Sequence, residues 1–228
     1  DWSSDVCSSD LGARFGHAMN KVWLPLSGRR IISRSLLNAA KNFKKYRLIL
    51  VLDPRDEELA REVVAREVPQ LKIEFVYGGQ TRHGSEYNAL KHLAPAINAG
   101  EIDVVLIHDG ARPLATPALF EEIATTASQH GGAIPTIKVS AHEMDQHQSE
   151  NVVRVQTPQG FQAKPLLAAY EKAAQDGFTG TDTGACMEKY FPNIKTISIA
   201  ADPSNVKITY PQDLVIAEHV LQKRGYRD

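Results

Sequence analysis

The chain has 228 residues, with 26 lysines and arginines against 27 aspartates and glutamates, and a formal net charge of −1. This balance excludes the strongly basic surface by which many proteins bind nucleic acid or anionic lipid non-specifically. The length suffices for one large domain that folds without disulfides or a structural metal.

Cysteine usage and hydropathy predict a cytoplasmic protein. The chain has two cysteines, Cys7 and Cys186, a sparse usage that is typical of compartments where thiols stay reduced. No apolar run approaches the roughly 20 residues of a membrane span, and the first residues lack the layout of a signal peptide. We therefore expect neither a membrane partner nor a nucleic-acid partner.

The first eleven residues differ from the rest of the chain. Trp2 and Val6 are separated by serines and aspartates, which are poor strand formers, so we predict no buried strand in Asp1–Asp10. Asp5–Leu11 is also what one reading frame of a common sequencing-adapter stretch encodes. Our hypothesis is that residues 1–11 are a non-native head and that residues 12–228 form a single domain.

Five short apolar runs rich in β-branched residues read as strands, and six segments with apolar residues every three or four positions read as helices. The predicted strands are Arg47–Asp53, Lys72–Tyr77, Ile102–Asp109, Ala133–Val139 and Lys195–Ile199. The predicted helices are Ile32–Phe43, Glu57–Glu67, Glu86–Ile97, Pro117–His130, Pro165–Gln175 and Pro211–Lys223.

The alternation of strands and helices predicts an α/β fold, a three-layer Rossmann-like sandwich with a mostly parallel sheet. Ligands of such folds bind beyond the carboxyl ends of the strands. Asp53, Gly78, Gly79 and Asp109 each follow or end a predicted strand and are therefore placed where a site should be.

The first candidate motif is Gly12–Gly16, followed by Lys21. Glycines let the backbone approach a phosphate closely, and Arg14 and Lys21 could neutralise charge that develops on phosphorus. Taken alone, such a motif is more often just a turn with two surface cations.

The second candidate is Asp109, which ends a strand before a turn of small residues. A carboxylate there suits Mg²⁺, which prefers one or two protein carboxylates plus substrate phosphates. The alternative is that Asp109 only caps the turn and Arg112 pairs with a surface acid.

Three further segments carry polar groups. Thr157 and Gln159 flank a proline, Thr181 could cap a helix or hold a phosphate at its start, and Asn205–Thr209 reads as a short strand that carries Lys207. His142 and His147 lie in a polar stretch without a third well-spaced metal ligand, which favours a solvated loop.

The order of these motifs is more specific than any one of them. G-x-R-x-G with a later lysine is followed by G-G-x-x-R-x-x-S from Gly78 to Ser85, H-D-G-A-R-P, Q-T-P-Q-G-F, T-D and N-x-K-I-T. The set, from about Gly12 to the final helix, resembles the 2-C-methyl-D-erythritol 4-phosphate cytidylyltransferases of the non-mevalonate isoprenoid pathway.

The resemblance implies a nucleotidyltransferase that moves CMP from CTP to the phosphate of methylerythritol phosphate, releases pyrophosphate and uses Mg²⁺. It implies homodimers that form through an arm, here at about residues 140–155. The implied catalytic residues are Arg14, Lys21 and Lys207, and Asp109 is the implied metal ligand. The implied CTP site contains Gly12, Gly79, Ser85 and Asp109, and the implied polyol-phosphate site contains Thr157, Thr181 and Lys207.

The chain departs from the family pattern at three places. Gln80 follows the second glycine of the base-reading loop, and Ser149 stands where the arm of the family carries an arginine. A cytidylyltransferase for ribitol 5-phosphate, or a silent nucleotide-binding homologue, is therefore an alternative. The third departure is the head, because the family begins with an apolar strand at the centre of the sheet. We expect a chain that lacks this strand to be unstable or inactive.

Overall fold

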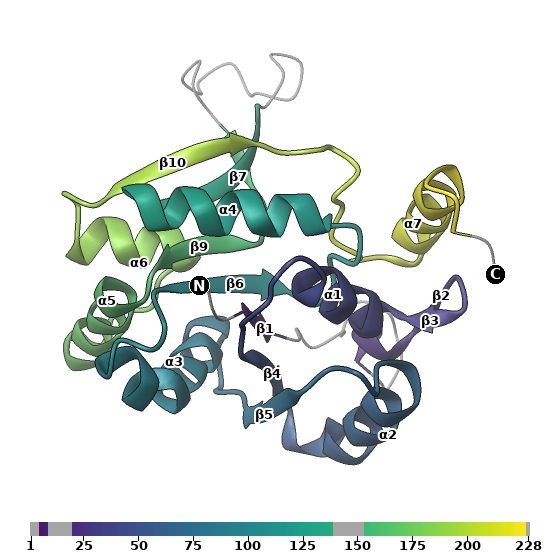
Figure 1. Ribbon diagram of the computed structural model, residues 1–228, viewed down its shortest axis with the longest axis horizontal. Helices are drawn as coiled ribbons and strands as arrows, with labels where there is room; N and C mark the ends of the chain where they lie inside the picture. Colours follow the sequence, from purple (N-terminus) through teal and green to yellow (C-terminus); the bar gives the residue numbers. More distant parts are fainter. Residues whose placement is uncertain (1–4, 9–19, 139–152, 227–228) are drawn as a thin grey trace.

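The computed structural model describes residues 5–8, 20–138 and 153–226. Within these ranges, eight strands form one sheet in the order β10-β7-β9-β6-β1-β4-β5, with β8 paired to β7. The strands are β1 (Asp5–Ser8), β4 (Leu48–Leu52), β5 (Ile73–Tyr77), β6 (Val104–Asp109), β7 (Gly131–Lys138), β8 (Val153–Val155), β9 (Gln159–Gln162) and β10 (Lys195–Ala200). Figure 1 shows this succession from β10 at the top to β5 at the bottom.

The sheet is mostly parallel, as predicted. β6, β1, β4 and β5 are parallel neighbours, and β10 is parallel to β7. β9 runs antiparallel to both β6 and β7, and β8 runs antiparallel to β7. The carboxyl ends of β4, β5 and β6 therefore meet at one edge of the sheet.

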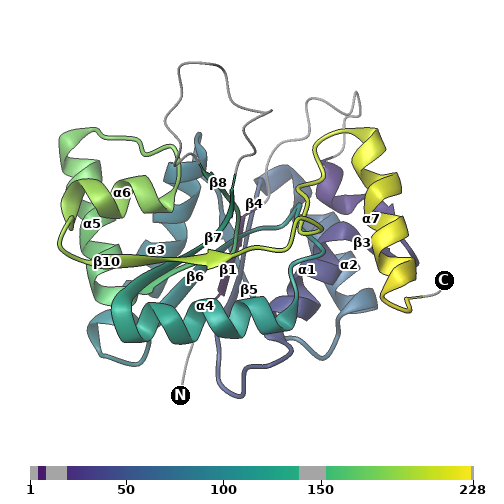
Figure 2. The ribbon, with the colours of Figure 1, turned by 90° about the horizontal axis from the view of Figure 1, so that it is seen from above.

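Seven α-helices accompany the sheet in the described residues (Figure 2). They are α1 (Ile31–Ala40), α2 (Glu57–Glu67), α3 (Arg82–Asn98), α4 (Pro117–His130), α5 (Ala163–Asp176), α6 (Thr183–Tyr190) and α7 (Pro211–Lys223). A hairpin of β2 (Pro25–Leu26) and β3 (Arg29–Arg30) precedes α1, and 3₁₀ turns occupy Lys21–Trp23 and Pro54–Asp56.

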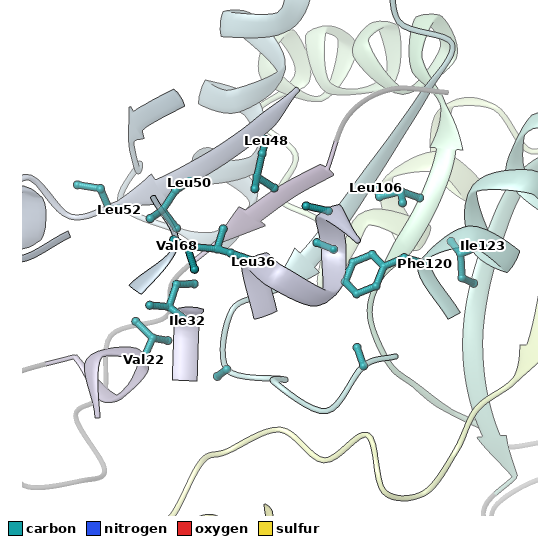
Figure 3. Close-up of a cluster of buried hydrophobic side chains, with 14 of the residues drawn as sticks. Val22, Ile32, Leu36, Leu48, Leu50, Leu52, Val68, Leu106, Phe120 and Ile123 are labelled. Carbon is teal, nitrogen blue, oxygen red and sulfur yellow. The ribbon is translucent and has the colours of Figure 1, made fainter. Parts of the chain in front are cut away.

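Two hydrophobic clusters cover the two faces of the sheet, which confirms the three-layer architecture. Leu48, Leu50 and Leu52 of β4 pack with α1, α2 and α4, and Figure 3 shows these leucines in one cluster with Leu36 and Phe120. The alternate residues of β4 pack instead with α3, α5 and α6. A strand that buries both faces needs a continuous apolar run, which is why β4 was recognisable in the sequence.

All five predicted strands and six predicted helices exist; α2, α4 and α7 have the predicted bounds, and the ends of the other helices are shifted. α3 begins four residues before the predicted Glu86, because the Thr81 side chain accepts a hydrogen bond from the Gly84 N–H at 3.0 Å and caps the helix there. α1 ends at Ala40 rather than Phe43.

The prediction that Asn205–Thr209 forms a strand is wrong. This segment has no strand pairing, although the Ile208 N–H donates to the Ala111 carbonyl at 2.9 Å. The Ile208 side chain is fully buried in a third cluster with Leu26, Leu114 and α7. The apolar alternation that predicted a strand therefore reflects two side chains of a loop, Val206 and Ile208, that pack on this cluster.

The prediction that Asp1–Asp10 contains no interior strand is also wrong for the backbone. Val6 of β1 lies opposite Ile49 of β4 and Ile107 of β6, with parallel pairing on both sides. Main-chain N–H and C=O groups form these ladders whatever the side chains are, and two buried neighbouring strands would otherwise lose their partners. The origin of residues 1–11 stays a hypothesis.

No helix in the described parts of the chain is long and apolar enough to cross a membrane.

Candidate active site

A buried ion pair lies at the carboxyl end of β6. Asp109 is the last residue of the strand and is 4% exposed, and its Oδ2 lies 2.6 Å from Lys207 Nζ. Its Oδ1 accepts a hydrogen bond from the Ala111 N–H at 3.0 Å. Burial alone would raise the pKa of Asp109, but the charge and hydrogen bond of Lys207, with the Ala111 N–H and the charge of Arg112, together outweigh burial and hold this pKa below its usual range. Asp109 is therefore an ionised carboxylate.

Thr157 connects the Q-T-P-Q-G-F motif to this pair. Its Oγ1 accepts a hydrogen bond from the Asp109 N–H at 2.9 Å and lies 3.1 Å from His108 Nδ1. His108 Nε2 is 3.2 Å from the Arg112 carbonyl oxygen, which can only accept. These partners assign the ring proton to Nε2, with Nδ1 accepting from the Thr157 hydroxyl. Burial lowers the pKa of His108 to about 4, so the ring is neutral at pH 7.

Asn205 joins three motifs. The Arg112 Nη1 donates to the Asn205 carbonyl at 2.7 Å, and Asn205 Nδ2 donates to Gln156 Oε1 at 2.8 Å and to the Thr157 carbonyl at 3.1 Å. Asn205 is 1% exposed. We call this hydrogen-bonded group of Arg112, Gln156, Thr157 and Asn205 the brace. It fixes the backbone two residues before Lys207 and hence the position of the Lys207 ammonium.

Asp109, Thr157 and Lys207, to which the family resemblance gave roles, thus lie together in the structure, from segments about 50 residues apart. Among the residues of this brace, the sequence analysis did not single out Asn205 or Gln156 as candidates. Both are polar residues beside the predicted ones, and their near-complete burial is a signal that only the fold supplies.

The predicted base-reading loop connects β5 to α3. The Gly79 N–H donates to Ser85 Oγ at 3.0 Å, and that hydroxyl donates to the Thr81 carbonyl at 2.9 Å. A Cβ on Gly79 would lie 2.8 Å from the carbonyl carbon of Gly84, which is backbone and cannot rotate away. Gly79 is therefore required for the turn to close, and the loop is a compact, internally bonded unit.

A buried carboxylate, Glu86, lies in α3 just after this loop and accepts a hydrogen bond from the first residue of the helix. Glu86 is 1% exposed; it accepts from Arg82 Nε at 2.8 Å and from the hydroxyls of Tyr170 and, at 3.5 Å, Thr183. Burial favours a neutral Arg82, but Glu86 and, more weakly, Asp109 keep its pKa above the ordinary value. The helical prediction that began at Glu86 treated this residue as part of an amphipathic face and missed its role.

The remaining predicted residues differ in where they lie. Lys21 is 4% exposed and starts a 3₁₀ turn whose cap is Asn20, with the Val22 N–H donating to Asn20 Oδ1 at 3.3 Å. Gly12, Arg14 and the arm position Ser149 lie outside the described residues, as do His142 and His147.

Thr181 does not cap α6, contrary to one of the two interpretations of its sequence. Asp182 is the cap, and its Oδ1 accepts from the Ala185 N–H at 2.8 Å. The Thr181 side chain is exposed. Gln159 ties the start of α6 to the site, because its amide lies 3.3 Å from both Asp182 Oδ2 and the Gly184 N–H. The aspartate is favoured as the cap because its carboxylate reaches two partners at once.

The donor set fits a cation shared with a substrate. The described residues contain no group of three or more histidine, cysteine, aspartate or glutamate side chains that could hold a metal by themselves. Asp109 offers one ionised carboxylate, whose oxygens each contact one hydrogen-bond donor and keep lone-pair capacity. One protein carboxylate completed by phosphates is the arrangement that Mg²⁺ favours in nucleotide sites.

Comparisons with known proteins point to one family. The IspD family model, described as 2-C-methyl-D-erythritol 4-phosphate cytidylyltransferase, matches residues 6–223. A protein of that name from Geobacillus kaustophilus (strain HTA426) is 33% identical over 232 residues, which cover 98% of each chain. Another of that name from Acaryochloris marina (strain MBIC 11017) is 35% identical over 229 residues, covering 96% of this chain and 93% of the relative.

Solved structures agree in fold. The crystal structure of 4-diphosphocytidyl-2C-methyl-D-erythritol synthase from Anaerococcus prevotii DSM 20548 superposes with a TM-score of 0.78 at 26% identity, covering 97% of this chain and 96% of that one. The 2-C-methyl-D-erythritol 4-phosphate cytidylyltransferase from Thermus thermophilus superposes with a TM-score of 0.71 at 24% identity, covering 95% of this chain and 98% of that one, and shows the same fold.

Proposed function

The chain belongs to the 2-C-methyl-D-erythritol 4-phosphate cytidylyltransferase family, and we propose that it uses the braced Asp109–Lys207 pair to carry out that reaction. The enzyme transfers CMP from CTP to 2-C-methyl-D-erythritol 4-phosphate. A phosphate oxygen of the acceptor forms a bond to the α-phosphorus of CTP, and the bond from that phosphorus to the β-phosphate oxygen breaks, which releases pyrophosphate.

The observation that carries the residue roles is the buried ion pair. The Lys207 side chain is 29% exposed while the Asp109 side chain is 6% exposed, so the ammonium faces the open side of the pair. We propose that Lys207 binds the acceptor phosphate from this position, as an ionised amine that stabilises the anionic nucleophile near phosphorus. No proton has to move, because the acceptor phosphate is already an anion.

Lys21 and Arg14 are proposed to stabilise the triphosphate as charge builds on it. Such transfer reactions depend on positioning and on cations rather than on a protein nucleophile. The mechanism needs no protein group to donate a proton. A His108 ring that is neutral at pH 7 is therefore compatible with it. Gly79 and Ser85 are proposed to read the cytosine, and Thr157 and Thr181 to seat the polyol phosphate.

Asp109 is the proposed ligand for Mg²⁺, together with phosphate oxygens of CTP. When bound, the cation would withdraw charge from the phosphates and so favour departure of pyrophosphate. This role needs the ionised form of Asp109, which the neighbouring Lys207 maintains.

Initial rates of pyrophosphate release with CTP and either 2-C-methyl-D-erythritol 4-phosphate or ribitol 5-phosphate test the substrate. We expect turnover with the first, with a product whose mass equals the sum of CMP and the acceptor less water. Faster turnover with ribitol 5-phosphate would contradict the proposed acceptor substrate. CTP binding without turnover on either polyol phosphate would contradict the proposed activity.

We also propose that the protein is a cytoplasmic homodimer. Val153 and Val155 are each 43% exposed on β8, an edge strand whose only pairing among described residues is to β7. Two valines on an exposed edge suit pairing with a second copy. Sedimentation velocity of the wild type and of a Val153→Asp variant tests this, and an unchanged dimer in the variant would exclude β8 from the interface.

A further inference from the structure

A cavity lies outside the candidate active site. It has a volume of about 420 Å³ and is bounded by the β2–β3 hairpin, α1, the segment before α4, and the end of α7. Figures 1 and 2 show α7 and the hairpin together at one end of the molecule, opposite α5 and α6. Its size is within the range of small-molecule pockets, about 300–1,000 Å³. Asp109, Thr157 and Lys207 are not among its described lining residues.

The cavity is strongly cationic. Arg29, Arg34 and Arg224 line it, and none of the described lining residues is an aspartate or glutamate. Backbone carbonyls position the three side chains: Arg29 Nη1 donates to the Glu67 carbonyl at 2.5 Å, Arg34 Nε to that of Leu26 at 2.8 Å, and Arg224 Nη1 to that of Leu114 at 2.9 Å. A neutral carbonyl fixes a guanidinium without cancelling its charge.

Among the described residues, two acidic side chains lie near this group from outside the lining: Asp202, and Glu67, whose carboxylate accepts a hydrogen bond from the Arg30 N–H at 2.7 Å. Asp202 Oδ2 is 3.5 Å from Arg224 Nη2, and the Asp202 side chain is 60% exposed. A solvated carboxylate at that distance offsets little of the charge. The cavity therefore keeps an excess of positive charge that an anion would neutralise.

Part of the wall beside the arginines is apolar, and Ser27, Asn38 and Thr116 are its polar members. Leu37, Pro113, Pro117 and Leu221 line the cavity, and the Tyr226 ring stacks under the Arg34 guanidinium, 5.3 Å from its centroid. An anion alone would leave this surface in contact with water. A ligand that joins a phosphate to a short hydrocarbon would cover it and gain from the burial.

We propose that this cavity is a binding site for a small organic phosphate. The phosphate lies between Arg29 and Arg224, where the guanidinium N–H groups that are not bonded to Glu67, Leu114 or Ser204 can donate to it, and the hydrocarbon part lies on Leu37, Pro117 and Leu221. The site adjoins the segment between Asp109 and α4, since Asn38 Nδ2 donates to the Pro113 carbonyl at 3.0 Å.

Calorimetric titration of the full chain with n-pentyl phosphate tests the site, with saturating reaction product, 4-diphosphocytidyl-2-C-methyl-D-erythritol, and Mg²⁺ present to occupy both the proposed CTP site and the proposed acceptor site. Inorganic phosphate and 1-pentanol are the comparison probes. We expect one equivalent of n-pentyl phosphate to bind at least tenfold more tightly than either. Absence of binding, or equal affinity for 1-pentanol, would overturn the proposal.

Charge-removing variants locate the ligand. Arg29→Gln and Arg224→Gln should each weaken n-pentyl phosphate binding about tenfold or more, whereas Arg61→Gln, which removes an exposed arginine from α2, should leave it unchanged. Arg224→Gln also loses the bond to Leu114, so thermal melting checks its fold and Arg29→Gln carries the test if it fails. Wild-type affinity in Arg29→Gln would place the ligand elsewhere. Binding is measured without turnover, so an inactive enzyme would not affect the result.

Discussion

At the scale of single residues, the site depends on buried polar groups whose protonation the fold sets. His108 is fully buried between Thr157 and the Arg112 carbonyl, and Phe120 packs on its ring with 4.8 Å between centroids. A second proton on the ring would reverse the direction of the Thr157 hydrogen bond at Nδ1 and place a charge in a fully buried site. Asp109, one residue later, is instead kept ionised by Lys207.

The depressed pKa of His108 predicts a loss of stability at mildly acidic pH. In the unfolded chain the imidazole gains its proton near pH 6.5, and in the folded chain only near pH 4. The stabilising contribution is therefore complete above pH 6.5 and is lost as the pH falls toward 4, by on the order of 3 kcal/mol in total. Urea unfolding at pH 7 and 4.5 should show a smaller difference for His108→Gln than for the wild type. Equal differences would contradict this account.

Replacement of Lys207 tests the ion pair. In Lys207→Gln, Asp109 keeps its buried charge without the cation, and the proposed contact with the acceptor phosphate is lost. We expect kcat/KM for the acceptor to fall roughly 100-fold or more, measured by pyrophosphate release. Lys195→Gln, which removes an exposed lysine from β10, is the matched control. A Lys207→Gln enzyme with near-wild-type kcat/KM would exclude the proposed role.

At the scale of elements, glycines in two different loops should affect two different properties, ligand binding and stability. Gly79 and Gly177 are both glycines that an added methyl would disturb, for different reasons. At Gly79 the obstacle is the Gly84 backbone, whereas Gly177 has open space but a φ of 65° after α5. The first lies in the predicted base-reading loop and the second lies at the C-terminal end of α5.

The two glycine variants should therefore behave in opposite ways. Gly79→Ala should weaken CTP binding at least tenfold in calorimetry, because the loop must open to admit the methyl group. Gly177→Ala should lower the melting temperature, by an amount that corresponds to about 1 kcal/mol of strain, and leave CTP affinity unchanged. Loss of CTP binding in both variants would indicate general damage rather than a specific loop role.

The strands of the sheet differ in how well the sequence predicts them. Buried parallel strands such as β4 and β6 were predictable because both faces demand apolar residues. β9 was not, because Gln159 and Gly160 interrupt its apolar character; a Cβ on Gly160 would lie 2.7 Å from Ile123 and Leu106 side-chain atoms. The pairing of Asp109 with Lys207 could be expected only through the family motif, because nothing local relates positions about 100 residues apart.

At the scale of the whole molecule, β1 joins the two halves of the sheet. It lies between β6 and β4, so all strands from β10 to β6 connect to β4 and β5 through it. The prediction of no interior strand relied on side-chain propensity, which is weaker than the requirement of two buried neighbours for hydrogen-bond partners.

Changes to β1 should therefore act on the entire fold. Deletion of residues 1–8 should abolish cooperative thermal unfolding or lower the melting temperature by about 10 °C or more, since both flanking ladders are lost. Asp5→Val with Ser8→Val should raise it, because interior parallel strands favour β-branched residues. Circular dichroism melts of the three chains measure this. A deletion variant as stable as the full chain would show that β1 contributes little.

The reversed direction of β9 has a consequence for how the active site is supplied. Parallel strands deliver only their carboxyl ends to the reacting edge, so each normally contributes through the loop that follows it. Because β9 runs the other way beside β6, the residues that precede it arrive at that same edge, which is how Thr157 reaches the Asp109 backbone. Residues at this edge therefore come both from loops that follow parallel strands and from the segment that precedes β9. An acceptor bound there would contact both kinds of segment.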